Sequence, residues 1–334
     1  MHELTGPLVV APMAGGPTTP ALVIEAGRAG SPAFLAAGYK PVSLVEEELR
    51  AVRAAGVPYG LNIFVPMPPP ADIAPLEAYR RLLQPEADRY EVELPPLRLH
   101  DDDGFDEKVQ LAIAYGVPLV SFTFGLPGRR VVDALRRAGS QVLITVTSAD
   151  EARAALTVAP GGLIAQAGTA GAHSATTSPA SYRGDTTALA TLAAVRAVTD
   201  LPVVAAGGTA SAADVDALLK QGAAAVQTGT ALLLADEAGT RAAHREALIS
   251  GEYTETVVTR AFTGQPARGL RNRFIDAYSA AAPIGYPSVH HLTTPIRAAA
   301  AKRGDASALN LWAGTGFASA RPGPVATLLD DLRP

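Results

Sequence analysis

Short apolar runs recur along the first 230 residues, and each run is followed by turn residues and, in most cases, by an amphipathic stretch. Within the runs, apolar side chains are continuous rather than alternating with polar ones. This pattern is typical of parallel strands that are covered on both faces. The eight runs span residues 8–13, 33–37, 59–65, 119–124, 141–146, 163–166, 203–206 and 225–228.

The amphipathic stretches predict helices between most of these runs. The first helix is expected to begin near Thr18 or Thr19, because threonine suits a helix cap and Pro20 suits the first helical turn. In the second helix, Ser43 and Glu46 have the spacing of a capping box. The predicted helices include residues 43–54, 129–138, 149–158, 186–198 and 211–221.

Eight strands alternating with helices predict an α/β fold, namely an eight-stranded (β/α)8 TIM barrel. A doubly wound open sheet is the alternative. It is less favoured because no run is followed by the GxGxxG turn and ribose-binding acid of dinucleotide-binding sheets.

Two segments depart from this alternation. Residues 66–104 are rich in proline and then in acid, which indicates an excursion with a short helix near residues 76–83; its run Asp101–Asp103 is expected to be a solvated face. Beyond Thr240 we find no strand-like run. We therefore expect a barrel over residues 1–238 and a mainly helical extension over 239–334 that packs on the open end of the barrel and caps its pocket.

Composition narrows the function. A chain of 334 residues with a formal net charge of -4 and no basic run has no electrostatic footprint for nucleic acid. The absence of cysteine excludes disulfides, a cysteine nucleophile and thiolate metal sites. The six histidines show no HxH or HExxH spacing, so no metal site is expected. His290 and His291, adjacent in a proline-rich segment, are expected at the surface.

The sequence also bears on location. No apolar run is long enough to span a bilayer, so no membrane association is expected. The first residues lack the basic and apolar regions of a secretory signal. We therefore expect a cytoplasmic protein; its oligomeric state is left open.

Two glycine-containing loops follow the seventh and eighth predicted strands. In TIM barrels these loops are a frequent phosphate site. Here they contain Gly207-Gly208 and Gly229-Thr230, whose N–H groups and hydroxyl suit an anion, as do the N-termini of the helices expected after them. Tight turns that need a positive φ would explain the same glycines. Because neither loop has a lysine, a phosphorylated cofactor that stays bound is favoured over a transferred phosphoryl group.

The stretch 161–177 begins as a buried strand and then breaks into small residues that end at His173. Glycines such as Gly171 let the backbone approach a flat or anionic group closely. A histidine after such a turn, at the carboxyl end of a strand, lies where these barrels keep their catalytic residues. The alternative is that His173 only satisfies backbone groups of its own loop.

The other strand ends suggest the kind of cofactor. Ala11, Pro12 and Met13 offer a small apolar surface with backbone donors, and Asn62 and Gln166 offer amides. Amides without acids suit the edge of a neutral heterocycle such as a flavin. Taken alone, Asn62 is equally explained as a satisfied core amide.

With these features in place, the chain resembles the FMN-dependent nitronate monooxygenases, also called 2-nitropropane dioxygenases, over nearly its whole length. The most specific stretches of the resemblance are 259–274 and Asn310-Leu-Trp-Ala-Gly314, which no general property of barrels predicts. The resemblance is carried by residues 11–16, 60–64, 120–125, 166–173, 205–208, 227–230, 259–274 and 310–314.

The resemblance implies FMN at the carboxyl ends of the strands, a nitronate or related small molecule as substrate, and O2 as co-substrate. It implies His173 as catalytic base and a flavin lined by Met13, Asn62, Gln166, Gly171, Gly208, Gln227, Gly229 and Thr230. This chain has Thr169, Ala172 and Ser174-Ala175 where the family usually has an acid, a glycine, and a basic residue followed by glycine. The alternatives are an NAD(P)H-dependent FMN reductase acting on a quinone or enoyl thioester, and a non-catalytic flavin-binding protein.

Overall fold

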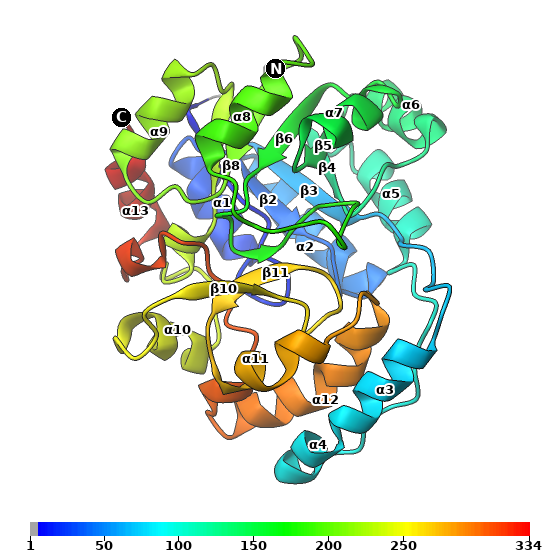
Figure 1. Ribbon diagram of the computed structural model, residues 1–334. Helices are drawn as coiled ribbons and strands as arrows, with labels where there is room; N and C mark the ends of the chain where they lie inside the picture. The colour runs from blue at the N-terminus through cyan, green and yellow to red at the C-terminus, as the bar shows by residue number, and fades with distance from the viewer. Residues whose placement is uncertain (1–5) are drawn as a thin grey trace.

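A closed barrel of eight parallel strands forms the centre of the molecule (Figure 1). In the computed structural model, which describes residues 6–334, the strand order is β1-β2-β3-β4-β5-β6-β8-β9, and β9 pairs with β1 to close the barrel. The predicted TIM barrel is thus confirmed. Of the six histidines of the sequence, His2 lies outside the described residues. The barrel strands are β1 Leu8–Val10, β2 Ala33–Ala36, β3 Tyr59–Phe64, β4 Leu119–Thr123, β5 Gln141–Val146, β6 Gly162–Gln166, β8 Val203–Ala206 and β9 Ala225–Thr228.

Side chains fill the inside of the barrel. One cluster of buried residues, including Val9, Phe34, Leu119 and Ile164, comes from seven of the eight barrel strands. A Cβ at Gly60 would lie 2.4 Å from the Phe34 ring, so the glycine makes room for that ring. The interior is therefore a packed core, and the space for a ligand lies beyond the strand ends.

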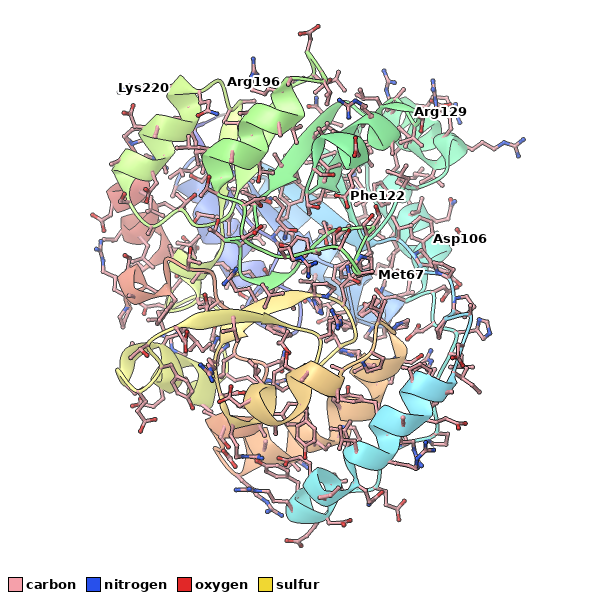
Figure 2. The ribbon with its side chains drawn as sticks, in the orientation of Figure 1. Met67, Asp106, Phe122, Arg129, Arg196 and Lys220 are labelled. Atoms are coloured by element: carbon pink, nitrogen blue, oxygen red, sulfur yellow. The ribbon has the colours of Figure 1, made fainter. Side chains whose placement is uncertain are left out.

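Helices surround the barrel. Thr19 caps α1 as predicted, since its hydroxyl accepts a hydrogen bond from Leu22 N. The capping box at Ser43 is wrong: α2 begins at Val42 with Pro41 as its N-cap, so Ser43 already lies inside the helix. Arg129 and Lys220 project outward from this layer (Figure 2). Its helices are α1 Pro20–Arg28, α2 Val42–Ala55, α5 Phe105–Ala114, α6 Arg129–Arg137, α7 Ala149–Leu156, α8 Ala188–Arg196, α9 Ala212–Lys220 and α13 Val325–Leu332.

The last helix, α13, occupies the eighth helical position of the barrel. It packs against α1 and α9, which flank the β9–β1 closure (Figure 1). Its apolar residues Val325, Leu328, Leu329 and Leu332 belong to the cluster that joins barrel and outer helices. The residues after 239 are therefore not one terminal extension. Most of them form an insertion between β9 and the final barrel helix.

This insertion contains strands that the hydrophobic pattern did not predict. Its two strands pair antiparallel with each other, and the second of them also pairs antiparallel with a short strand from the barrel loop after β6, giving the order β10-β11-β7. With four residues or fewer and partly exposed residues in β10, these strands lack the continuous apolar signature of the barrel strands. The elements are β7 Ala172–His173, η1 Thr230–Leu232, α10 Ala242–Ile249, β10 Thr256–Thr259, β11 Ala267–Leu270, α11 Arg273–Tyr278, η2 Ser279–Ala281, α12 Ser288–Lys302, η3 Ala306–Ala308 and η4 Phe317–Ser319.

The helices of the excursion after β3 pack on this insertion. The excursion carries two helices, α3 Ala74–Leu82 and α4 Gln84–Tyr90, in the region where one was predicted. Their buried residues Leu76, Tyr79 and Tyr90 share a hydrophobic cluster with α11 and α12. The Arg273 guanidinium binds the Glu86 carboxylate across the two segments.

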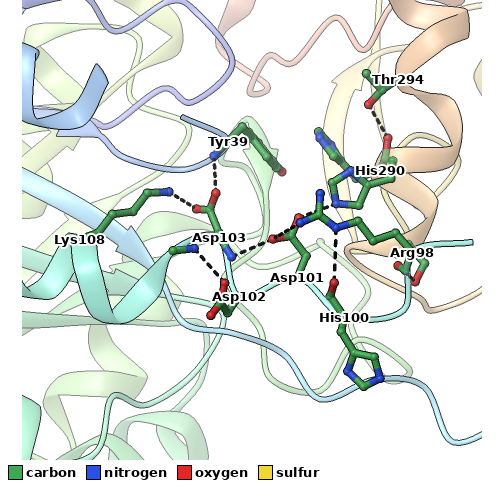
Figure 3. Close-up of polar contacts among 12 residues, drawn as sticks. Tyr39, Arg98, His100, Asp101, Asp102, Asp103, Lys108, His290 and Thr294 are labelled. Carbon is green, nitrogen blue, oxygen red and sulfur yellow. Dashed lines mark hydrogen bonds and ion pairs between the residues drawn. The ribbon is translucent and has the colours of Figure 1, made fainter. Parts of the chain in front are cut away.

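In the acid run at the end of the excursion only Asp102 is exposed, as expected, whereas Asp101 and Asp103 are partly buried and paired. Asp103 accepts a hydrogen bond from Tyr39 N and forms an ion pair at 2.9 Å with Lys108, which is fully buried (Figure 3). Asp101 contacts His291 Nε2 at 2.6 Å. These carboxylates fasten the excursion to the barrel and to α12.

If α13 is a structural part of the barrel, shortening one of its buried side chains should weaken the fold. We expect Leu329→Ala, at a position with 0% exposure, to lower the free energy of unfolding by about 2–5 kcal/mol. Thr327→Ala, at an exposed position of the same helix, is the control and should change it by less than about 0.5 kcal/mol. Equal urea midpoints for both variants would contradict the assignment of α13 to the barrel.

Candidate active site

One cavity of about 560 Å³ lies at the carboxyl ends of the barrel strands and beneath the insertion. All residues that the sequence pointed to line it, although they come from the ends of five different barrel strands. Their roles in binding and catalysis stay predictions, but their common location is a finding. The predicted residues that line the cavity are Ala11, Met13, Asn62, Gln166, Gly171, His173, Gly207, Gly208, Gln227, Gly229 and Thr230.

An anion cradle lies at the ends of β8 and β9. The N–H groups of Gly207, Gly208 and Gly229 donate to no acceptor within residues 6–334. The buried Thr209 hydroxyl likewise has no partner within this range. Thr230 Oγ1 accepts a hydrogen bond from Gly314 N at 2.9 Å, so its own proton is free for donation. Several unpaired donors that converge from two loops suit a phosphate.

Gly208 is needed for conformation and for space. Its φ is +73°, and a Cβ there would lie 2.7 Å from Thr169 Oγ1. A tight turn with a positive φ therefore does require a glycine at this position, as the alternative explanation predicted. The free N–H groups show that the same turn also presents donors to the cavity.

The helices after these loops differ from the expectation. The N-terminus of α9 is capped by its own Ser211, and Asp214 accepts a hydrogen bond from Ala210 N. After β9 the chain forms only the 3-10 helix η1. The positive end of an α-helix thus contributes less than the bare N–H groups of the loops.

The three amides divide into two kinds. Asn62 Nδ2 is satisfied within the barrel by Ser121 and Thr123, as a core amide would be. Both ends of the Gln166 amide hold the strand of the histidine, through His173 O at 2.9 Å and Ala175 N at 2.7 Å. Gln227 Nε2 is buried and has no partner within residues 6–334, which leaves a donor for a ligand.

The first strand end supplies fewer donors than expected. Ala11 N donates to Thr228 O at 2.8 Å, and Met13 N donates to Thr18 Oγ1 at 2.8 Å. Both N–H groups are therefore occupied. What Ala11 and Met13 offer the cavity is an apolar surface.

His173 is held by β7, the strand that joins the barrel to the insertion. Its residue pairs with Ala267 of β11, and its Nε2 lies 2.9 Å from Thr263 Oγ1. The Thr263 hydroxyl lies 3.3 Å from Gln265 O, to which it donates. When the hydroxyl donates to this carbonyl it accepts from Nε2–H, and Nδ1 is then the nitrogen that can accept a proton.

Aromatic rings surround the His173 imidazole. Their centroids lie 5.5 Å away for Phe124 and Trp312 and 5.9 Å away for Tyr286. Burial, together with the charge of Arg297, lowers the pKa of His173 to about 3. The imidazole is therefore neutral at physiological pH, as a proton acceptor must be.

The two residues before His173 have unusual backbone constraints. Ala172 has a φ of +63°, in the left-handed region that favours glycine, which is the residue usual in the resembling family at this position. A Cβ at Gly171 would lie 2.5 Å from Gly314 N, so this glycine permits close contact with the segment that follows η3. Despite the alanine, the ring of His173 remains within the cavity.

Several cavity residues were missed from sequence, and His290 was assigned wrongly. Instead of lying at the surface, His290 lines the cavity and its ring stacks on Tyr39 at 4.1 Å (Figure 3). Arg297, which lies on α12 like His290, and Trp312 also line the cavity. The motif at 310–314 pointed to Trp312, whereas neither His290 nor Arg297 carries a local signal, because only the packing of α12 brings them to the barrel.

Residues 6–334 contain no group of three or more His, Asp or Glu side chains placed to hold a metal ion. No helix in this range has the length and apolar character needed to cross a bilayer.

Comparison with known proteins gives a consistent result. The family model for nitronate monooxygenase matches residues 1–334. A probable nitronate monooxygenase of Staphylococcus saprophyticus is 34% identical over 92% of this chain and 88% of the relative. One from Staphylococcus aureus strain Newman is 32% identical over 99% of this chain and 94% of the relative. A crystal structure of nitroalkane oxidase from Streptomyces ansochromogenes has a TM-score of 0.94 and 42% identity, covering 99% of this chain and 95% of that one.

The lowered pKa of His173 predicts a particular response to acid. The unfolded chain takes up this proton near pH 6.5 and the folded protein only near pH 3, so the folded state loses stability as the pH falls through this window. When the pH is lowered from 7 to 5, this histidine should lower the free energy of unfolding by about 2 kcal/mol. His173→Asn should therefore show that much less acid destabilisation in urea titrations, whereas His100→Asn, at an exposed position, should behave as the parent. The same pH slope in all three proteins would contradict the assignment.

Proposed function

Because the chain belongs to the nitronate monooxygenase family, we propose that it oxidises alkyl nitronates with O2 on a bound FMN, giving carbonyl compounds and nitrite. Nitroalkanes enter the same reaction after losing a proton. The observation that carries the proposal is the juxtaposition, in one cavity, of a neutral histidine and an anion cradle.

The residues of the cavity fit a phosphorylated flavin. The free N–H groups of Gly207, Gly208 and Gly229, with the hydroxyls of Thr209 and Thr230, would hold the phosphate. Other groups of the cavity would line the ring system of the flavin: the apolar surface of Ala11 and Met13, the Asn62 amide and the unpaired Gln227 Nε2. When bound, FMN supplies the electron transfer, which no side chain of the cavity provides.

His173 would take the proton from the carbon next to the nitro group, at Nδ1. Thr263 fixes the ring through Nε2 and keeps Nδ1 free to accept. A base whose pKa is about 3 is weak until an anion forms beside it. The developing nitronate is such an anion, and it stabilises the imidazolium.

The low pKa of His173 also ranks the two substrates. A preformed nitronate needs no proton removed, so its oxidation does not depend on the basicity of the imidazole. We therefore place nitronates first and neutral nitroalkanes second. The hydrogen bonds between the Gln166 side-chain amide and the backbone of His173 and Ala175 would hold the histidine in a fixed position during proton removal.

The phosphate cradle can be tested at Gly208. We expect Gly208→Asp to purify with little flavin, because the side chain would clash with Thr169 and place a carboxylate where an N–H faces the phosphate. Gly139→Asp is the matched control: Gly139 also has a positive φ, of +93°, but a Cβ there meets nothing within 4 Å. The measurement is the flavin-to-protein absorbance ratio, with mass spectrometry of the ligand released from the parent protein.

FMN should be the released ligand, and the control should retain it. FAD, or a Gly208→Asp variant with full occupancy, would show that the phosphate lies elsewhere. Rapid anaerobic bleaching of the flavin by NADH would point instead to a reductase.

The role of His173 is tested by comparing two substrates in one variant. We expect His173→Asn to lose about 10²–10⁴-fold in turnover of a neutral nitroalkane, the usual effect of removing a general base. Oxidation of the preformed nitronate should stay within about tenfold of the parent, because no proton has to be removed. Steady-state oxygen consumption on both substrates provides the measurement.

The comparison of the two substrates on the same variant is its own control, because a distorted pocket would lower both activities alike. Equal loss on both substrates would show that His173 positions the anion or the fold, and equal retention would show that it takes no part.

A further inference from the structure

Arg297 is a buried cation that has only neutral partners. This residue, on α12, has an exposed fraction of 8%. It donates to Thr293 Oγ1 at 3.1 Å, to Thr294 Oγ1 at 2.9 Å and to the backbone oxygen of His290 at 2.9 Å. Within residues 6–334, no carboxylate forms an ion pair with it. A buried charge of this kind is costly unless a counter-charge arrives.

The guanidinium also has donors left over. Of its five N–H groups, three are used in the hydrogen bonds just described, and Nη1 reaches only Asn310 Oδ1 at 3.5 Å. Arg297 and Asn310 both line the cavity. At least one Nη1–H is therefore free for a ligand there.

The charge of the cavity wall agrees with this. No Asp or Glu is among the described residues that line the cavity, whereas Lys40, Arg241 and Arg297 are, although the chain as a whole has a formal net charge of -4. Lys40 is neutralised by Glu48 at 2.7 Å, and Arg241 is at an exposed position, where water screens its charge. The acid-free wall leaves Arg297 as a buried positive charge that only a ligand can balance.

Arg297 belongs to the His173 side of the cavity rather than to the anion cradle. Burial is the larger cause that lowers the pKa values of both His173 and His290, and the positive charge of Arg297 lowers both of them further. Burial lowers the pKa of Arg297 itself to about 10, so the guanidinium stays charged at physiological pH. The phosphate donors come from the loops after β8 and β9, not from α12.

We propose that Arg297 binds the negative charge of the substrate, and so selects the planar nitronate oxyanion over the neutral nitroalkane. This inference rests on the function proposed above. The free Nη1–H would donate to a nitronate oxygen, and His173 would face the carbon side of the same small molecule. The ion pair that forms would supply the counter-charge that the protein itself omits.

A structural role for Arg297 makes a different prediction. Pro295 lies inside α12 and removes one helical N–H, and Arg297 and Thr294 both donate to the His290 carbonyl beside it. If Arg297 only repaired this helix, its removal would destabilise the protein and affect every ligand alike. Binding of a small planar oxyanion, measured apart from turnover, separates the two roles.

The first experiment uses nitrate as a probe, because it is a planar delocalised oxyanion. Trp312 is the only tryptophan of the chain and lines the cavity, so its fluorescence, together with the flavin absorbance of the holoenzyme, reports binding. At constant ionic strength we expect Arg297→Met to weaken nitrate binding by about 30-fold or more. Arg297→Lys should lie between the variant and the parent, since it keeps the charge but loses the planar fork.

Lys302→Met is the matched control, because it removes one exposed positive charge from the same helix. It should leave the nitrate dissociation constant within about twofold. If Arg297→Met binds nitrate like the parent, or if the parent does not bind nitrate at all, the proposed subsite is wrong. The thermal midpoint of Arg297→Met should stay within a few degrees of the parent; a large fall with unchanged nitrate binding would indicate the structural role.

The second experiment compares KM for a nitronate and for its parent nitroalkane. Arg297→Met should raise KM for the nitronate by about 30-fold or more and KM for the nitroalkane by less than about threefold. An equal rise for both would overturn charge selection. A parent protein that binds nitrate through Arg297 but oxidises neither compound would refute the proposed function and leave the anion subsite standing.

Discussion

The structure depends on one property of a closed parallel sheet: all eight strands end at the same edge. Every connection that leaves a carboxyl end must therefore begin at the rim of one opening. Segments as distant in sequence as residues 11–13 and 227–230 meet there, and a single cavity results. Small residues concentrate at this rim because several backbones approach one another and leave room for a ligand.

The insertion between β9 and α13 covers this opening, so the single cavity is lined by two parts of the chain. The barrel loops supply the bare N–H groups, and the insertion supplies Arg297, His290 and Trp312. The strand β7 joins the two parts, because it leaves the barrel after β6 and pairs with β11. His173 thus lies on the seam, where a cofactor bound by the barrel and a substrate bound by the insertion would meet.

Burial and charge act together in this seam. The histidines His173 and His290 are held neutral because burial and the Arg297 cation both lower their pKa values. The cation persists because its own pKa falls only to about 10. A wall with cations and neutral imidazoles but without acids favours an anionic ligand, in a protein whose overall charge is negative. The acids are placed elsewhere, for example at Asp103 and Glu86, where they fasten the excursion and the insertion to their neighbours.

The sequence by itself predicted the barrel, because eight continuous apolar runs of strand length indicate a parallel sheet covered on both faces, and no run is followed by the dinucleotide-binding turn typical of the open alternative. It also determined the rim, since glycines and amides directly after strands have a fixed place in such a fold. It did not determine where the last helix or the short strands belong. The pairing of β11 with β7 joins residues roughly a hundred positions apart, and α13 resembles any amphipathic helix until it packs between α1 and α9. The sequence also placed His290 at the surface and left Arg297 unnoticed, because an isolated arginine or histidine in a helix has no local signal. Only the tertiary structure decided that α12 turns these side chains toward His173, because burial and the absence of acidic neighbours are properties of the assembled cavity rather than of any one segment.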